Sequence, residues 1–112
     1  MEQDEFALVV DVKTKPGSER EYESLMLEVV ERQTAEPTYI GTTVHRDPDD
    51  PTHFVLYEAW RDREDFETVQ MKRSYRRKYE ESLDRLLERP RAMTFIVPTW
   101  SQGRLPKASG LA

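Results

Sequence analysis

The sequence contains no cysteine, and this absence excludes several kinds of site at once. Without a thiol, the chain cannot build a disulfide framework, a cysteine nucleophile, an iron–sulfur cluster or a cysteine-based zinc site. Its two histidines are too few for a histidine-rich metal cage. We therefore expect no metal and no tightly bound organic cofactor.

Excess positive charge and long apolar runs are also missing. The net charge of −5 argues against general nucleic-acid binding, which needs a positive surface field. No apolar run reaches the length of a membrane span. The acidic start, MEQDEF, lacks the basic and apolar regions of a signal peptide. These features predict a soluble cytoplasmic protein that contacts neither nucleic acid nor membrane.

The chain is long enough for one domain, which we place at residues 1–98. Residues 99–112 contain glycine, proline and serine, and we expect a tail that is mobile or docked on a partner subunit. Within the domain, residues 53–60 form a predicted strand that is apolar or aromatic on both faces. A strand with one wet face would alternate apolar with polar residues, so this pattern predicts that both sides are covered.

Hydrophobic periodicity and proline breaks predict the order β-α-β-β-α-β, with the second helix broken near residues 72–74. This is the ferredoxin-like α+β arrangement, a four-stranded antiparallel sheet with helices on one face. Two local contacts are also expected: a capping box between Ser18 and Glu21, and an ion pair between Glu81 and Arg85. The predicted elements are strands 6–13, 39–46, 53–60 and 92–97, and helices 18–35 and 62 to about 87.

Helices on one face leave the other face of the sheet open. A monomer rarely exposes a broad apolar patch, so we predict a homodimer formed through this face, which makes a dimeric α/β barrel. At about 25 cal/mol per Å², burying several hundred Å² would stabilise such a dimer by many kcal/mol in gross terms. The residues expected on the open face are Ala7, Val9, Val55, Tyr57, Ala59 and Ile96, or their neighbours of opposite parity.

One long segment carries a family resemblance. The first strand followed by Lys15-Pro16-Gly17, and then YIGTTVHRDPDDPTHFVLYEAWRDREDFE, resembles the antibiotic biosynthesis monooxygenase (ABM) domain family over roughly residues 6–97. The resemblance implies a dimeric α/β barrel. Characterised members of that family include cofactor-free quinone-forming monooxygenases, haem-degrading monooxygenases and an isomerase of a signalling sugar.

The chain departs from that family at its haem-related positions. Haem-degrading members carry asparagine, tryptophan and histidine where this sequence has Val10, Val69 and Tyr79. Many other members carry histidines at the positions of Val69 and Ser74. These differences argue against haem degradation, so any reaction has to use other residues.

A cofactor-free oxygenase needs a base, a dry pocket and an oriented substrate. The candidate bases are Glu58, His45 and His53. Burial in an apolar strand would raise the pKa of Glu58, as an acid or base requires; the alternative is a structural pair with an arginine or lysine. For the two histidines the alternative is an exposed residue at a strand end or turn.

Large rings with polar tips suit an aromatic-binding pocket, and Tyr57, Trp60, Tyr75 and Tyr79 are the candidates. The alternative for each ring is core packing. Arg76 lies in a basic run, residues 72–79, which could form a rim that attracts an anionic substrate or could be a solvated helix face.

Three functions remain open. The leading interpretation, taken mainly from the resemblance, is a cofactor-independent monooxygenase acting on a small aromatic or quinol-like compound. The missing histidines favour an alternative, a non-catalytic small-molecule-binding or stress-related dimer of the same fold. The third is an isomerase acting on a phosphorylated small molecule, which would use the basic run.

Overall fold

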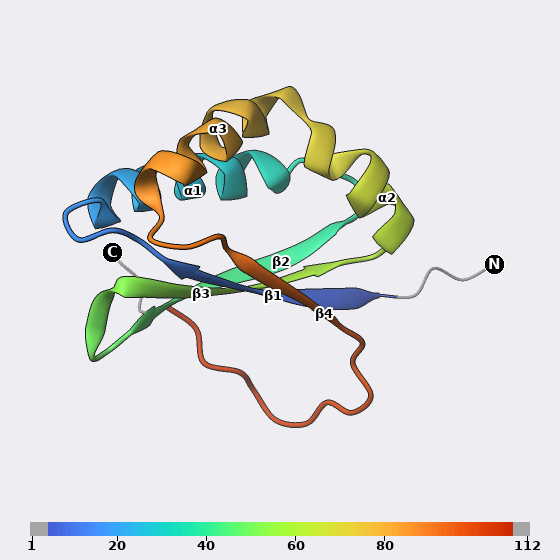
Figure 1. Ribbon diagram of the computed structural model, residues 1–112. Helices are drawn as coiled ribbons and strands as arrows, with labels where there is room; N and C mark the ends of the chain where they lie inside the picture. Colours follow the sequence, from blue (N-terminus) through green and yellow to red (C-terminus); the bar gives the residue numbers. More distant parts are fainter. Residues whose placement is uncertain (1–4, 109–112) are drawn as a thin grey trace.

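A computed structural model of the protein describes residues 5–108. Its four strands form one antiparallel sheet in the order β2-β3-β1-β4, and the helices lie together on one side of it (Figure 1). The predicted ferredoxin-like α+β fold, with its broken second helix, is therefore confirmed. In chain order the elements are β1 (Phe6–Lys13), α1 (Glu19–Gln33), β2 (Tyr39–Asp47), β3 (Asp50–Trp60), α2 (Arg63–Thr68), the 3-10 turns η1 (Gln70–Lys72) and η2 (Ser74–Arg76), α3 (Arg77–Leu86) and β4 (Ala92–Ile96).

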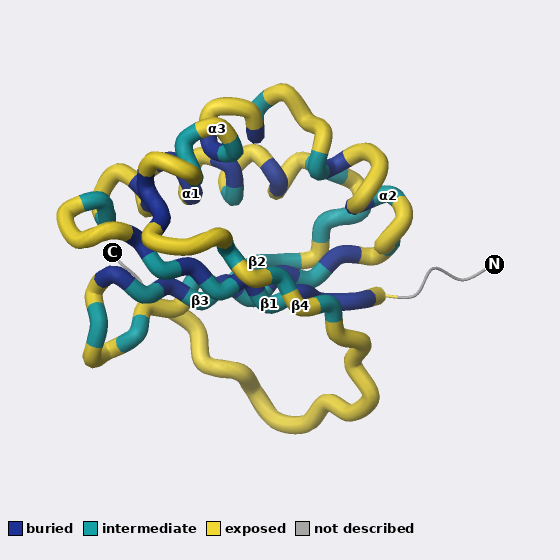
Figure 2. The backbone as a smooth tube through the Cα atoms, in the orientation of Figure 1, coloured by how far each residue is buried: buried dark blue, intermediate teal, exposed yellow. Residues whose placement is uncertain are grey.

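The hydrophobic core lies between the sheet and the helices. Most of the residues coloured as buried in Figure 2 belong to the strands and helices that enclose it. Alternate residues of β1 and β3 face it, because side chains along a strand point to opposite faces. Four aromatic rings gather in this layer at centroid distances of 5.2–6.1 Å, namely Phe6, Trp60, Phe66 and Phe95, with Tyr39 packed on Trp60.

The opposite face of the sheet carries the residues of the other parity. The register pairs Ala7 with Ala59 and with Ile96, and Val9 with Tyr57, so these side chains share one face, as expected. No helix within residues 5–108 covers this side (Figure 1). We call it the open face; its central residues are Ala7, Val9, Thr43, His45, Val55, Tyr57, Ala59, Thr94 and Ile96.

Both local contacts expected from spacing are wrong. Ser18 lies at the N-cap of α1 but makes no side-chain cap hydrogen bond; instead the Gly17 amide donates to Glu19 Oε1 at 2.6 Å. Gly17 has φ +91°, a conformation that glycine adopts without strain. Arg85 does not pair with Glu81 along its own helix but donates two hydrogen bonds to Glu21 of α1, at 3.0 and 2.7 Å.

The segment after β4 is a tail without helix or strand through residue 108. It passes below the open face, drawn in red in Figure 1, and is exposed throughout (Figure 2). Val97, Trp100 and Leu105 are its large exposed apolar side chains. Predictions for residues 1–4 and 109–112 lie outside the described residues. Across residues 5–108, no helix has the length and apolar character needed to cross a membrane.

Candidate functional site

The candidate site lies on the helix-covered face of β3, around Glu58 and Trp60. The alternation of this strand turns both side chains into the core, where Glu58 is 7% exposed and Trp60 is fully buried. The indole Nε1 of Trp60 donates a hydrogen bond to Glu58 Oε1 at 3.1 Å. Contacts with Tyr39 and Phe66 hold the indole ring, so the donor approaches the carboxylate from a fixed position.

Arg76 reaches the same region from the end of η2. Although it belongs to the basic run, it is only 7% exposed and is not part of a solvated helix face. Its guanidinium donates to Glu80 Oε2 at 2.8 Å, while Arg91 donates to the other oxygen of Glu80, also at 2.8 Å. One carboxylate therefore pairs with two arginines and provides the counter-charge for the buried Arg76.

A small cavity of about 20 Å³ lies between α1, β3 and η2. This volume is enough for roughly one water molecule. Its polar lining comes from Glu58, Arg76, Gln33 and the phenol-bearing side chain of Tyr79, and the rest of its wall is apolar: Met26, Val29, Val30 and Leu56.

Two polar atoms from the wall of this cavity have no protein partner. They are Oε1 of Gln33, a residue that is 1% exposed, and Nε of Arg76. Leaving a buried polar atom unpaired costs about 1–3 kcal/mol, and native proteins seldom do so. The two atoms therefore suit a polar occupant of the cavity.

Burial raises the pKa of the Glu58 carboxyl, and the hydrogen bond from Trp60 and the charges of Arg76 and Arg91 oppose this rise. Burial also raises the pKa of Tyr79, whose hydroxyl lies 3.0 Å from that of Tyr22. A carboxyl group with a raised pKa can accept a proton from a weakly acidic substrate and return it, which is what general acid–base catalysis needs.

Tyr75, a further predicted substrate-binding residue, lies outside the cavity lining. Its hydroxyl donates to Glu36 Oε2 at 2.9 Å, and the Arg32 guanidinium lies 5.3 Å from its ring centroid. Burial and the hydrogen bond to Glu36 raise the pKa of Tyr75 to about 12. This tyrosine joins α1 to the segment after α2.

His45 and Tyr57 lie across the sheet from Glu58, on the open face. They contribute to a depression of about 640 Å³ between the sheet and the tail, with Thr43, Trp100 and Leu105 also in its wall. His45 Nδ1 lies 3.1 Å from the Val55 carbonyl oxygen. Because a carbonyl only accepts, Nδ1 carries the proton and Nε2 is left as an acceptor while the ring is neutral.

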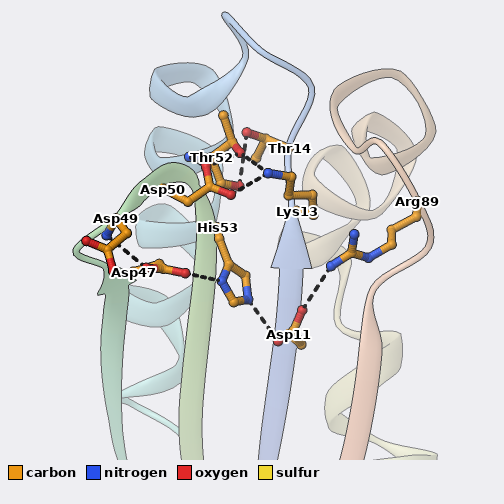
Figure 3. Close-up of polar contacts among 9 residues, drawn as sticks. All are labelled: Asp11, Lys13, Thr14, Asp47, Asp49, Asp50, Thr52, His53 and Arg89. Atoms are coloured by element: carbon orange, nitrogen blue, oxygen red, sulfur yellow. Dashed lines mark hydrogen bonds and ion pairs between the residues drawn. The ribbon is translucent and has the colours of Figure 1, made fainter.

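His53 is held between two carboxylates at one end of the open face (Figure 3). Nδ1 lies 2.9 Å from Asp47 Oδ2 and Nε2 lies 2.9 Å from Asp11 Oδ2, while Arg89 lies 3.7 Å from the other oxygen of Asp11. The hydrogen bonds that His53 donates to Asp47 and Asp11 raise its pKa. A ring that donates from both nitrogens is an imidazolium, so in this arrangement His53 has no lone pair to act as a base.

The eight site residues predicted from the sequence thus fall into separate groups. Glu58, Trp60, Arg76 and Tyr79 meet in the core around the cavity, whereas His45, Tyr57 and His53 lie on the open face. Sequence reasoning missed Gln33, although a signal exists: it follows Val29 by four residues and so lies on the buried stripe of α1. Within residues 5–108, no group of three or more histidine, aspartate or glutamate side chains has an arrangement that could hold a metal ion.

Comparison with solved structures shows the same fold in several proteins. A protein from Nitrosomonas europaea superposes with a TM-score of 0.80 at 19% identity, covering 92% of this chain and 98% of the other. Rv0793 from Mycobacterium tuberculosis gives 0.79 at 19% identity, with 89% and 100% coverage. SnoaB, a cofactor-independent oxygenase from Streptomyces nogalater, gives 0.78 at 17% identity, with 90% and 99% coverage. At these identities the likeness shows the fold alone.

A search of curated proteins found no match to the sequence. The family model for antibiotic biosynthesis monooxygenase matches residues 5–80, which is more than half of the chain and includes β1 through η2. The matched region contains Glu58, Trp60, Arg76 and Gln33, and it also contains Tyr79, so it includes the whole polar lining of the cavity. The chain belongs to the antibiotic biosynthesis monooxygenase family.

Proposed function

We propose that the protein is a cofactor-independent monooxygenase that acts on a small aromatic or quinol-like compound at the Glu58 cavity. One observation carries the proposal: a buried carboxyl group with a raised pKa, fixed by an indole donor, lies in the wall of a cavity that is also lined by Gln33 and Arg76, each with one buried polar atom that lacks a partner. Family membership and the fold shared with SnoaB support an oxygenase in general.

The chemistry needs little from the protein. Glu58, as carboxylate, takes a proton from an electron-rich phenol or enol, and the resulting anion passes one electron to dioxygen. The substrate radical and superoxide then combine into a peroxide anion, which takes the proton back from Glu58 to become a hydroperoxide, and the hydroperoxide loses water. For a substrate CH₂ group the balance is CH₂ plus O₂ giving C=O plus H₂O, so the substrate supplies all the electrons and no cofactor is required.

The neighbouring side chains have separate roles in this proposal. Trp60 orients the Glu58 carboxyl through its indole N–H, and the cationic Arg76 stabilises the anion formed on deprotonation. Tyr79 and the apolar wall keep water out, which strengthens these interactions. A ring is larger than the present cavity, so substrate entry requires η2 and α1 to separate.

The test is oxygen uptake with a panel of quinols and anthrones. Wild type should consume oxygen faster than buffer, and Glu58→Gln should lower the rate by about 10²–10⁴-fold, because the base is lost while the size is kept. Trp60→Phe, which removes the indole donor, should lower it by about 10-fold. The matched control is Glu28→Gln, a change of the same type at an exposed site on α1.

Two outcomes would redirect the proposal. Uptake that is equal in wild type and Glu58→Gln would remove Glu58 from the mechanism. No uptake above buffer with any compound would favour the second candidate, a non-catalytic small-molecule-binding dimer, which the small volume of the cavity supports. The isomerase alternative has less support, because Arg73 and Arg76 of the basic run are already paired with Glu36 and Glu80.

We further propose that the protein is a cytoplasmic homodimer joined through the open face. The apolar side chains Val9, Val55, Tyr57 and Ile96 share this face, and no helix covers it. Light scattering at micromolar concentration should report twice the 13.3 kDa chain mass. Val9→Glu should give a folded monomer, because it places a charge in the centre of the contact, whereas Glu28→Gln should stay dimeric. A wild-type monomer would exclude this interface.

A further inference from the structure

We propose that Gln33 is a specificity-determining residue which, together with Arg76, selects ligands that present a hydroxyl group to the Glu58 cavity. This inference rests on the proposed function, since it names the part of the substrate that the same cavity accepts. It starts from Gln33, a residue that the proposed mechanism does not use.

Gln33 is the last residue of α1 and is the only polar residue among the buried positions of that helix apart from the hydroxyl of Tyr22. It is 1% exposed, lines the cavity, and leaves Oε1 without a hydrogen-bond partner. An apolar residue would fill the same space without leaving a buried acceptor unpaired.

The second unpaired atom is complementary to the first. Arg76 Nε is a donor, Gln33 Oε1 is an acceptor, and the side chains of both residues line one cavity with room for one oxygen-sized group. A carbonyl oxygen could satisfy only Arg76, and an ammonium group could satisfy only Gln33. A hydroxyl group satisfies both at once, because its oxygen accepts while its hydrogen donates.

This arrangement also fits the position of the base. Without substrate, a water molecule meets the same requirements and can donate its second hydrogen to Glu58. A substrate hydroxyl displaces that water and keeps the bonds to Gln33 and Arg76. For proton transfer the hydroxyl turns about its C–O bond, so that its hydrogen leaves Gln33 Oε1 and points to Glu58. The O–H bond then breaks, Glu58 gains the proton, and the oxyanion retains the hydrogen bond from Arg76. Gln33 therefore acts on binding of the neutral hydroxyl, and Arg76 acts on the anion.

The experiment compares phenol with anisole, which has the same ring and oxygen but no hydroxyl hydrogen. Binding to the full chain is measured by calorimetry, with NMR shifts of the cavity residues showing where each compound binds. Wild type should bind phenol at least about 10-fold more tightly than anisole, as expected for a site that leaves a buried acceptor unpaired with the wrong ligand. Gln33→Met, which keeps the length and removes the acceptor, should reduce this preference to near unity.

The matched control is Gln102→Met, in the exposed tail on the other side of the sheet, which should keep the wild-type preference. Equal affinities in wild type, or an unchanged preference in a folded Gln33→Met protein, would overturn the inference. Oxygen uptake separates it from the proposed function. If wild type prefers phenol but consumes no oxygen with any compound, the role of Gln33 is supported and the monooxygenase proposal fails. If it consumes oxygen but shows no preference for phenol, the monooxygenase proposal is supported and the role of Gln33 fails.

Discussion

The two faces of β3 give their ionisable side chains opposite electrostatic environments. Glu58 points into the core, where burial disfavours its charge, and His53 points to the open face, where Asp11 and Asp47 favour its charge. The two residues are five positions apart on one strand. The comparison shows that the face of the sheet, more than the residue type, determines which group is available for proton transfer. A histidine is the commoner base in enzymes, yet here the glutamate is better suited.

The largest difference between the faces should be in stability. Trp60→Ala removes a fully buried ring that packs on Tyr39 and Phe66, and should lower the free energy of unfolding by about 3–5 kcal/mol. Tyr57→Ala, on the open face of the same strand, should cost less than half as much in a monomeric Val9→Glu background. Denaturant unfolding measures both, and equal losses would show that the two faces are packed alike.

The next effect concerns the charges behind the cavity. Glu80→Gln removes the carboxylate shared by Arg76 and Arg91, and leaves the buried Arg76 without its counter-charge. We expect a loss of about 2 kcal/mol, less than the 3–5 kcal/mol typical of a fully buried pair, because the Glu80 side chain is 30% exposed. Glu81→Gln, at an exposed site of the same helix, should change little. Equal unfolding midpoints for the two variants would contradict this role for Glu80.

The pH dependence of stability should distinguish Glu58. Because the native pKa is raised above the usual value of 4.5, the native protein binds this proton more tightly than the unfolded chain does. The resulting stabilisation is complete below pH 4.5 and is lost as pH rises through the native pKa. Wild type should therefore lose stability relative to Glu58→Gln as the pH rises above 4.5 and through the native pKa. A difference that is constant with pH would show that burial does not shift this pKa.

His53 should titrate above its usual pKa of 6.5, which NMR of the imidazole resonances measures directly. Its contribution to stability is present below pH 6.5 and lost as pH rises through the raised pKa. Asp47→Asn removes the largest cause and should lower the pKa of His53. Asp49→Asn, in the same turn but without a side-chain bond to the ring, should leave it unchanged. If Asp47→Asn leaves the pKa of His53 unchanged, the hydrogen bond between His53 and Asp47 that Figure 3 shows does not form in solution.

The smallest effect is expected at the surface pair between α1 and α3. Glu21→Gln removes the negative charge and one of the two oxygens that accept hydrogen bonds from Arg85, yet both side chains are at least half exposed. Exposed pairs contribute little because water and salt screen them, so the loss of stability should be the smallest among these variants and smaller still in high salt. A loss as large as that of Glu80→Gln would show that exposure is a poor guide to the strength of these pairs.

The fold was predictable because the signals that specify it are local. The alternation in β1 and β3, the proline breaks and the short link between β2 and β3 determine both the order of the elements and the residues on each face. The errors concern side-chain partners. Sequence spacing favoured an ion pair between Glu81 and Arg85, but tertiary packing brings Glu21 of another helix close to Arg85. Spacing along one helix carries no information on that neighbour.

The site was predictable in its residue types but not in its grouping. Glu58 and Trp60 share a face of one strand, so their meeting follows from period-two alternation. The burial of Arg76 does not follow from a run of five cations, because it depends on a turn between two 3-10 segments and on Glu80 and Arg91 from elsewhere. The position of His53 between Asp11 and Asp47 depends on the register of β1 with β3 and on the hairpin turn, which sequence alone did not provide.

The attachment of α3 to β1 determines which wall of the cavity is able to move. Lys15 N–H donates to the Leu86 carbonyl, Glu88 N–H donates to the Lys13 carbonyl, and Thr14 pairs with Leu87, so the end of this helix is fastened to the sheet by backbone bonds. The segment 70–76 has no such anchor, and it contains an extended residue, Arg73, between its two turns. Amide hydrogen exchange should thus be slow at Lys15 and Glu88 and faster across 70–76, and under the proposed function this segment is the part of the wall that we expect to move when a ring enters.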